Sequence, residues 1–367
     1  MIFKLLLVFS AVLISAHQTS AATDKIICFF ASWAGYRNGD GSFKPNNIDP
    51  NLCTHVFYAF LGVDTDGSLK ILDSWNEIDL GGLQNVESLK SVNPNLKVLV
   101  SIGGWNAGNA ILNGVAASST LRANLIASCI SFFQQWGYDG IDIDWEYPVN
   151  SDKANFVKLL QEMRTAFDAN NYLISVTVSA TPLSSYDVPQ ITAVADLINI
   201  MSYDYHVAGQ GGVTGHNAPL YGPESVNTSV HAWLDAGADS AKLSLSVPFY
   251  GHSFTLADET KHGIGDSATT GIGGPLTQSP GVLGYNEICE YYNDWTRVWD
   301  DEAQVPYSYD SFNWASFDDP ESIGIKAKYA ADNGLAGVAI WSIDTDDFHG
   351  SCGTVDVLLQ AIKNNID

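Results

Sequence analysis

The chain has 367 residues, of which 46% are hydrophobic and only 16% are charged. This composition supplies enough apolar surface for a large core and excludes a disordered chain. With 17 basic and 41 acidic residues, the net charge is −24. Such a charge repels nucleic acids and anionic membranes, so we exclude both as partners and expect a neutral or cationic ligand.

The first predicted element is a cleavable secretory signal over residues 1–21. Lys4 precedes an apolar run over residues 5–14, and the small residues Ser20 and Ala21 follow, as in signals removed on export. A buried N-terminal helix is the alternative. No later stretch of the sequence approaches the roughly 18 apolar residues that a membrane span needs. We therefore expect a secreted, extracellular protein.

Short apolar runs rich in β-branched residues recur through the rest of the chain and predict strands. They cover residues 25–30, 55–60, 97–102, 140–144, 173–178, 197–201, 243–247 and 337–341. Helical periodicity appears over residues 118–136, 153–167, 322–332 and 355–362. Buried strands alternating with helices predict an α/β fold, a closed (β/α)8 TIM barrel, with a doubly wound open sheet as the alternative.

The interval between the last two predicted strands is too long for one crossover helix. Its main part, residues 251–320, is rich in Gly, Thr, Ser, Tyr and Asp and contains a strand-like piece at residues 252–256. We therefore predict a small α+β insertion domain over residues 251–320, within a barrel formed by residues 22–250 and 321–367. In a TIM barrel this insertion stands on the face that carries the active site.

The chain contains five cysteines, Cys28, Cys53, Cys129, Cys289 and Cys352. Export permits disulfides, and an odd number leaves at least one cysteine unpaired. We expect Cys129 to be free, because it lies on the apolar stripe of the helix predicted over residues 118–136, where a thiol packs as a small hydrophobic side chain. The sequence Asn227-Thr228-Ser229 is an acceptor motif for N-glycosylation at Asn227.

The fourth predicted strand and the residues after it, 139–148, carry a series of carboxylates. Side chains alternate along a strand, so Asp142, Asp144 and Glu146 share one face and the apolar residues between them share the other. Burial and mutual repulsion keep a proton on at least one of them, which suits a general acid. Glu146 lies nearest the cleft and is the predicted proton donor, with Asp144 in the second role and Asp142 tuning its charge.

A calcium or magnesium site is the main alternative for these carboxylates, because clustered acidic oxygens suit both ions. Carboxylates aligned on one strand do not surround an ion, however, and no histidine joins the motif. We therefore predict neither a metal nor a cofactor.

With these motifs, the sequence resembles the family 18 glycoside hydrolases, the chitinases and chitinase-like lectins, and most of all the animal, especially arthropod, members. The resemblance covers essentially the whole mature chain. Its motifs are Ser-Ile-Gly-Gly-Trp-Asn at residues 101–106, the carboxylate run at 139–148, Met-Ser-Tyr-Asp at 201–204, Val-Pro-Phe-Tyr-Gly at 247–251, Gln-Val-Pro-Tyr at 304–307 and Trp-Ser at 341–342. It implies a chitinase acting on chitin or chitooligosaccharides, and we expect a monomer.

The resemblance also implies a mechanism. A family glutamate at the position of Glu146 protonates the glycosidic oxygen, and the substrate's own N-acetyl carbonyl attacks the anomeric carbon, so the product keeps its β configuration. Carried over to this chain, Asp144 orients the acetamido group and Asp142 relays charge beneath it. Tyr203 hydrogen-bonds the acetamide oxygen, and Asp204 binds the distorted sugar.

Aromatic residues are expected to bind the sugar rings, whose apolar faces stack on flat side chains. The resemblance places Trp341 under the reacting sugar and Trp33 and Trp105 against neighbouring units, with Phe60 and Tyr147 lining the centre. The other substrate-binding residues that it implies are Gly104, Asn106, Met201 and Tyr250.

The resemblance pairs Cys28 with Cys53 and Cys289 with Cys352. Three positions depart from the pattern of many relatives. Phe29 stands where many have a tyrosine that helps to hold the charge of the deepest aspartate, residues 205–209 lack a tryptophan, and His252 replaces a frequent arginine. These departures affect, in the same order, the proton shuttling through Asp142, the stacking on the leaving-group side and some polar contacts around the cleft.

Two other functions share this barrel. A chitin-binding lectin or growth-factor-like protein typically replaces the acid residue, whereas Glu146 is intact here. An endo-β-N-acetylglucosaminidase acting on N-glycans shares the mechanism, but the predicted insertion, which deepens the groove for a linear polymer, favours a chitinase.

Overall fold

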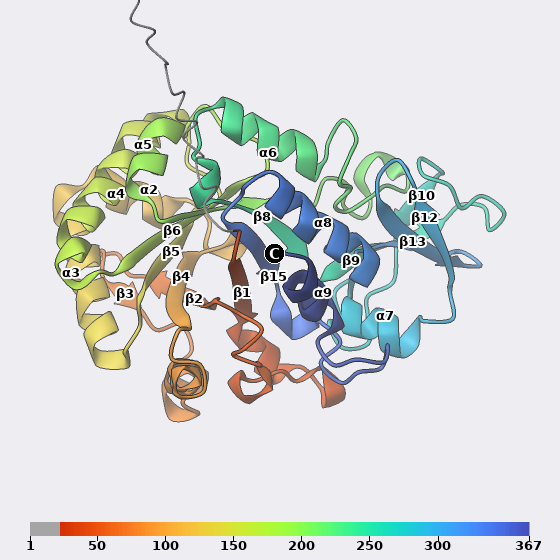
Figure 1. Cartoon of the computed structure of the whole chain (residues 1–367), viewed down its shortest axis with the longest axis horizontal. Helices are drawn as coiled ribbons and strands as arrows, with labels where there is room; N and C mark the ends of the chain where they lie inside the picture. The colour runs from red at the N-terminus through yellow and green to blue at the C-terminus, as the bar shows by residue number, and fades with distance from the viewer. Residues whose placement is uncertain (1–22, 367) are drawn as a thin grey trace, which may run out of the picture.

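A computed structural model describes residues 23–366, which form a parallel β-barrel with a second sheet beside it (Figure 1). The predicted secretory signal at residues 1–21 lies outside the described residues. The barrel strands are β1 (Lys25–Ala31), β2 (His55–Val63), β4 (Lys97–Gly103), β5 (Gly140–Asp144), β6 (Leu173–Ser179), β7 (Leu197–Met201), β8 (Leu243–Pro248) and β15 (Gly337–Trp341). All the predicted strands form, and the predicted α/β barrel is confirmed.

The barrel strands are parallel and follow one another in chain order. The barrel closes where β1 pairs with β15, so that Ile26 lies opposite Val338. The short strand β3 (Leu69–Lys70) is antiparallel to the end of β2 and extends one wall of the barrel mouth. Because the strands all point the same way, their carboxyl ends form one face, where functional loops gather in this fold.

Helices cover the outside of the barrel (Figure 1). They are α1 (Gly82–Ser88), α2 (Ala110–Ala117), α3 (Ser119–Trp136), α4 (Lys153–Phe167), α5 (Val188–Val194), α6 (Val226–Asp235), α8 (Pro320–Asp332) and α9 (Val357–Asn365). Local signals set their ends. The Ser118 side chain accepts a hydrogen bond from the first turn of α3, and Gly137 ends that helix with a φ of 74°, a conformation that glycine adopts readily.

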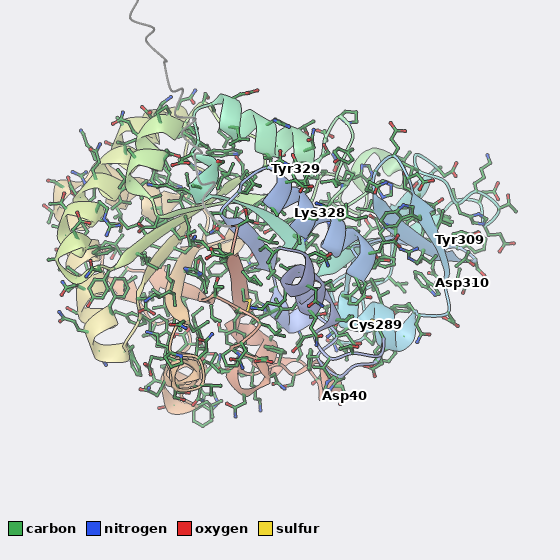
Figure 2. All side chains as sticks on the ribbon, viewed as in Figure 1. Asp40, Cys289, Tyr309, Asp310, Lys328 and Tyr329 are labelled. Atoms are coloured by element: carbon green, nitrogen blue, oxygen red, sulfur yellow. A yellow bond between two sulfur atoms is a disulfide. The ribbon has the colours of Figure 1, made fainter. Side chains whose placement is uncertain are left out.

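The residues that follow β8 and precede β15 in the chain, where the insertion was predicted, form a second, antiparallel sheet. Its elements are β9 (Tyr250–Leu256), β10 (Ala268–Thr270), β11 (Val282–Gly284), α7 (Tyr285–Tyr291), β12 (Thr296–Asp300), β13 (Val305–Asp310) and β14 (Asn313–Ser316). Figure 2 labels Tyr309 and Asp310 on β13, beyond the end of the barrel. Phe254 and Trp314 belong to a small apolar cluster of this sheet. The exact domain boundaries stay a prediction.

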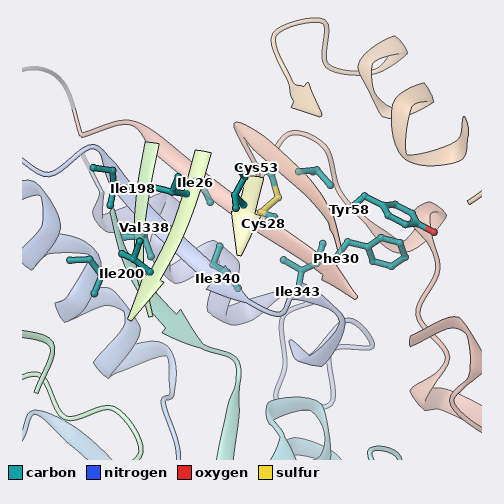
Figure 3. Close-up of a cluster of buried hydrophobic side chains, with 14 of the residues drawn as sticks. Ile26, Cys28, Phe30, Cys53, Tyr58, Ile198, Ile200, Val338, Ile340 and Ile343 are labelled. Atoms are coloured by element: carbon teal, nitrogen blue, oxygen red, sulfur yellow. A yellow bond between two sulfur atoms is a disulfide. The ribbon is translucent and has the colours of Figure 1, made fainter. Parts of the chain in front are cut away.

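The main core lies between the outer face of the barrel and its helices. Figure 3 shows part of it, including Ile198 and Ile200 of β7 and Val338 and Ile340 of β15. Alternate residues of the same strands point the other way, and Phe29 belongs to a smaller apolar cluster of strand residues. The strands also bury polar residues, among them Asp142 and Asn199.

The structure contains the disulfides Cys28–Cys53 and Cys289–Cys352, which are the pairs that the resemblance implies. The first appears in yellow in Figure 3. Cys129 on α3 is free and buried, as expected, and burial raises the pKa of its thiol. None of the helices within residues 23–366 has the length and apolar character needed to cross a bilayer.

Candidate active site

A cleft of about 1590 Å³ opens at the carboxyl ends of the barrel strands. Its floor and walls include four of the five predicted catalytic residues, Asp144, Glu146, Tyr203 and Asp204. The predicted substrate-binding residues all line it as well: Trp33, Phe60, Gly104, Trp105, Asn106, Tyr147, Met201, Tyr250 and Trp341. The fifth predicted catalytic residue, Asp142, lies deeper in the barrel and is fully buried. The fold therefore brings the predicted site residues together.

The predicted carboxylate series runs from the barrel interior to the cleft. Asp142 and Asp144 are on β5, and Glu146 follows in the loop after this strand. Asp144 is 4% exposed, and its Oδ1 atom has no hydrogen-bond partner among the described residues. Glu146 is less deeply buried than the two aspartates. This order gives the outermost carboxyl group access to a ligand in the cleft.

Hydrogen bonds from neighbouring strands hold Asp142. Its Oδ2 atom accepts a bond from Ser101 Oγ of β4 at 2.7 Å, and its Oδ1 atom accepts one from Thr177 Oγ1 of β6 at 3.0 Å. Asn199 of β7 approaches the same oxygen at 3.5 Å. Burial raises the pKa of Asp142 to about 6, while the hydroxyl donors favour the charged form and oppose this rise.

The two outer carboxyl groups have raised pKa values for related reasons. Burial, and next the negative charges of Glu146 and Asp142, hold the pKa of Asp144 well above its usual range. Burial also raises the pKa of Glu146, with a contribution from the charge of Asp204. Carboxyl groups in such surroundings retain a proton at a pH where exposed ones have lost it. Glu146 can therefore deliver a proton to a ligand in the cleft.

Two glycines let the chain pass close to the carboxylate strand. Gly103 has a φ of 109°, and a Cβ atom there would lie 1.9 Å from the Asp144 carbonyl oxygen. Gly104 donates its N–H to that same oxygen at 2.8 Å and has no room for a side chain beside the Phe60 ring. The Gly-Gly pair of the 101–106 motif thus serves the packing of the site.

Asp204 is held from three sides at the cleft wall. Its backbone has a φ of 58°, and its N–H donates to Asn217 Oδ1 at 2.9 Å. Its Oδ1 atom accepts bonds from the Tyr250 hydroxyl at 2.6 Å and from His252 Nε2 at 2.8 Å. The sequence motifs indicated Tyr250 and Asp204, but they did not predict that Asn217 and His252 support them.

Three aromatic rings from different segments of the chain meet at the base of the cleft. The Phe60 ring stacks on Trp341 with centroids 5.7 Å apart and on Trp33 with centroids 6.0 Å apart. Trp33 is 45% exposed, and Trp105, on the loop after β4, is 75% exposed. Exposed indole rings beside a polar site suit stacking against the apolar faces of sugars.

Several cleft residues were not identified from the sequence. They lie outside the motifs, on strand β3 and on loops and helices: Lys70, Leu72, Ile111, Leu183, Gln210, Glu224 and Thr228. None belongs to a periodic pattern or a chemical constellation that would mark it. Val207 and Gln210 line the cleft after β7, in the region where the sequence lacks the tryptophan of many relatives.

Two further residues singled out in the sequence, Phe29 and Asn227, lie outside the cleft. The Phe29 ring packs against Phe57 and Trp341, with centroids 4.9 and 5.8 Å away. Asn227 lies in the first turn of α6, and its Oδ1 atom accepts a hydrogen bond from the Tyr329 hydroxyl of α8 at 2.9 Å. Glycosylation of Asn227 stays a prediction.

Comparison with known proteins identifies one family. The family model for the glycosyl hydrolases family 18 matches residues 25–346. The probable chitinase 2 of Drosophila melanogaster is 38% identical over 369 residues, covering 92% of this chain and 75% of that protein. The crystal structure of the Ostrinia furnacalis Group IV chitinase in complex with allosamidin has a TM-score of 0.89 and 40% identity, covering 93% of this chain and 98% of that one.

A further solved structure bears on the choice between enzyme and lectin. Human YKL-39, described as a pseudo-chitinase with retained chitooligosaccharide binding properties, has a TM-score of 0.87 and is 35% identical, covering 93% of this chain and 99% of that one. The same fold therefore accompanies both catalysis and binding without catalysis, and the residues of the site have to distinguish them.

Proposed function

We propose that this chain, which belongs to family 18 of the glycosyl hydrolases, is a secreted chitinase. It cleaves the β-1,4 linkages between N-acetylglucosamine units of chitin and chitooligosaccharides, with retention of configuration. The observation that carries this proposal is the placement of Glu146 at the cleft above two buried aspartates, with its pKa raised by burial. The sequence pattern at residues 1–21 and the two disulfides support export.

Glu146 acts as the general acid. A protonated carboxyl group at the cleft surface donates its proton to the glycosidic oxygen as the bond to the anomeric carbon breaks. The raised pKa keeps this proton available near neutral pH. After the leaving group departs, the Glu146 carboxylate takes a proton from water while the water oxygen attacks the anomeric carbon. This attack breaks the bond between that carbon and the acetamido oxygen, and it leaves Glu146 protonated again.

The nucleophile belongs to the substrate, as the resemblance implies. The acetamido carbonyl oxygen attacks the anomeric carbon, so no second carboxylate at nucleophile distance is needed. Asp144, whose Oδ1 atom has no partner among the described residues, accepts the acetamido N–H and stabilises the cation that forms. Tyr203 lines the cleft and is half-buried, and burial raises the pKa of its hydroxyl well above the usual value, so the hydroxyl stays neutral and donates to the acetamide oxygen.

The aromatic floor and Asp204 position the sugar chain. Trp341 lies under the reacting sugar, where its ring stacks on Phe60. Trp33 and Trp105 offer exposed rings to neighbouring units. Asp204, held by Tyr250 and His252, presents a carboxylate to sugar hydroxyl groups. A neutral, acetylated polymer matches this cleft better than an anionic one, because the protein itself is strongly acidic.

A chitin-binding lectin is the second candidate, and the existence of a pseudo-chitinase with this fold keeps it open. An endo-β-N-acetylglucosaminidase acting on N-glycans is the third. Against the lectin stands the intact carboxyl group of Glu146. The cleft is not enclosed, its volume is about 1590 Å³ and its walls come from several loops, which favours a linear polymer over the branched core of an N-glycan.

Turnover and affinity measured on the same preparation test the proposal. The wild-type protein should hydrolyse chitin hexamer, and Glu146→Gln should lose nearly all turnover while it binds the hexamer with similar affinity, because the amide keeps the shape but has no transferable proton. Glu224→Gln, at the cleft rim, is the matched control and should keep its turnover. Binding without turnover in the wild type would instead identify a lectin.

A further inference from the structure

We infer that Asp344 and Arg37 are positioning residues that hold Trp33 against Trp341 for substrate binding. Neither residue lines the cleft, and neither belongs to the sequence motifs of the site. The inference rests on the proposed function, since it concerns the subsites of the same cleft. It starts from the short helix η1 (Ser32–Tyr36), which carries Trp33.

The Asp344 carboxylate contacts both ends of η1. Its Oδ1 atom accepts a hydrogen bond from the Ala31 N–H, at the start of η1, at 3.2 Å. Its Oδ2 atom lies 2.6 Å from Nη2 of Arg37, which follows the last residue of η1. Arg37 Nη1 also donates to the Asp344 carbonyl oxygen at 3.1 Å. One residue therefore fixes where the Trp33 segment begins and where it ends.

Asp344 also belongs to the segment that carries the other indole. It lies in η11 (Ile343–Thr345), three positions after Trp341 at the end of β15. The rings of Trp33 and Trp341 have centroids 6.2 Å apart. The ion pair therefore links the two loops on which these rings stand. It fixes their separation although it touches neither ring.

The cost of this ion pair is the second argument for a positioning role. The Asp344 side chain is 0% exposed and that of Arg37 is 15% exposed, so folding removes most of the water around both charges. A buried ion pair of this kind adds little net stability compared with apolar side chains of the same size. What it does supply is a defined geometry, because a guanidinium fork accepts few orientations.

The remaining contacts of η1 show why the ion pair matters for Trp33. The Ser32 carbonyl oxygen accepts a hydrogen bond from Asn76 Nδ2 at 2.9 Å, so this contact holds the backbone of η1 and not the Trp33 ring. Trp33 itself keeps 45% of its surface exposed, so packing alone leaves its ring loosely held. Loss of the Asp344 contacts would let the ring move away from Trp341 and lower the affinity for long substrates.

A double-mutant cycle between Arg37 and Trp33 tests this inference. The readout is kcat/KM on chitin hexamer for Arg37→Lys, Trp33→Ala and the double variant. Trp33→Ala should lower kcat/KM by about tenfold, the effect of losing one stacking contact. Arg37→Lys should lower it through KM rather than kcat. In the Trp33→Ala background, Arg37→Lys should have no further effect, because residues that act through one another are not additive.

Arg164→Lys is the matched control, since Arg164 forms ion pairs with Asp168 and Asp196 at the opposite end of the barrel. Its effect should be small and should multiply with that of Trp33→Ala. If the effects of Arg37→Lys and Trp33→Ala also multiply, the positioning role is wrong. If Arg37→Lys does not fold, the cycle is repeated with Asp344→Asn. This variant keeps an acceptor for the Ala31 N–H.

The experiment distinguishes a failure of this inference from a failure of the proposed function. If the wild-type protein binds the hexamer but does not cleave it, the proposed chitinase activity fails, and the same cycle is measured on dissociation constants. Non-additive affinities would then still support the positioning role, and additive ones would overturn it.

Discussion

The Nε2 atom of His252 lies 2.8 Å from Oδ1 of Asp204, and this contact joins the second sheet to the loop after β7. The other ring nitrogen, Nδ1, faces the Gly281 carbonyl oxygen at 3.2 Å. Both partners are acceptors. The ring of His252 therefore lies between the Asp204 carboxylate and the Gly281 carbonyl oxygen and supports Asp204 within the wall of the cleft.

The first prediction concerns this contact. His252→Gln should lower kcat/KM on chitin hexamer about tenfold, because a hydrogen bond to a charged group is worth about 1.5 to 3 kcal/mol. Steady-state kinetics on the purified variant measure the loss. The control is His262→Gln, because His262 is half-buried and hydrogen-bonds to the Glu259 carbonyl oxygen away from the cleft. Equal effects of the two variants would refute the role of His252.

The second prediction concerns the alkaline side of the pH–activity profile. Glu146 has to be protonated, so activity falls as the pH rises through the pKa of Glu146. That pKa is raised by burial and, further, by the charge of Asp204. Asp204→Asn removes this charge and should move the alkaline limb of kcat/KM to lower pH, whatever its effect on the maximum rate. The control Glu224→Gln should leave the position of the limb unchanged.

The third prediction is that the folded state is less stable at pH 8 than at pH 5. Burial raises the pKa of Glu77 to about 7, that of Asp346 to about 7 and that of Asp142 to about 6. Between about pH 4 and 7 the folded protein holds protons on these groups that the unfolded chain has released. Each such proton lowers the free energy of unfolding by about 1.4 kcal/mol per pH unit of increase.

His55 acts in the opposite direction, because burial lowers its pKa to about 4. Its contribution is present above the unfolded value near 6.5 and is lost as the pH falls towards 4. His216 acts with His55, because burial lowers its pKa as well. Burial also raises the pKa values of Asp144 and Asp356, so the carboxyl groups outweigh the two histidines and the net trend favours the acid side. Denaturant unfolding at pH 5, 6, 7 and 8 measures it, and Glu77→Gln should flatten the slope. A midpoint that rises from pH 5 to 8 would contradict the account.

The fourth prediction concerns the disulfide between Cys289 and Cys352, which encloses 63 residues. Replacing both with serine should lower the free energy of unfolding by about 4 kcal/mol in the chain-entropy model.

In the wild-type protein, a thiol reagent should label Cys129 only after unfolding, because its side chain is buried. A bridge that contains Cys129, found by peptide mapping without reduction, would be incompatible with this structure.

The barrel was predictable because its signals are local. The apolar runs set the strands, and the apolar stripe of α3 set a helix that matches its expected range within one residue. The second sheet was predicted only as a mixed insertion. Its central strand β9 pairs with β10, β11 and β14, which lie at different distances along the chain. Such pairings leave no period in the sequence from which to derive them.

The residues of the site were likewise predictable where their signal is local and unpredictable where it is not. Asp142, Asp144 and Glu146 were predictable from alternation on one strand, and the family motifs supplied the rest of the cleft floor. The contact between His252 and Asp204 was not predictable, because His252 belongs to the second sheet and Asp204 to the loop after β7. The sequence shows only that a histidine replaces the arginine frequent at position 252. The same holds for Asp344, because its role depends on the meeting of β1 and β15 at the barrel closure.

Product analysis on chitin hexamer and on partly deacetylated chitosan tests the central claim, substrate-assisted hydrolysis with Glu146 as the acid, most directly. Proton magnetic resonance within the first minutes should show the β-anomer at each new reducing end. Sequencing of those ends from chitosan should find N-acetylglucosamine alone, because the acetamido group is the nucleophile. The α-anomer as first product, or frequent glucosamine at the new ends, would contradict the account and require a nucleophile from the enzyme.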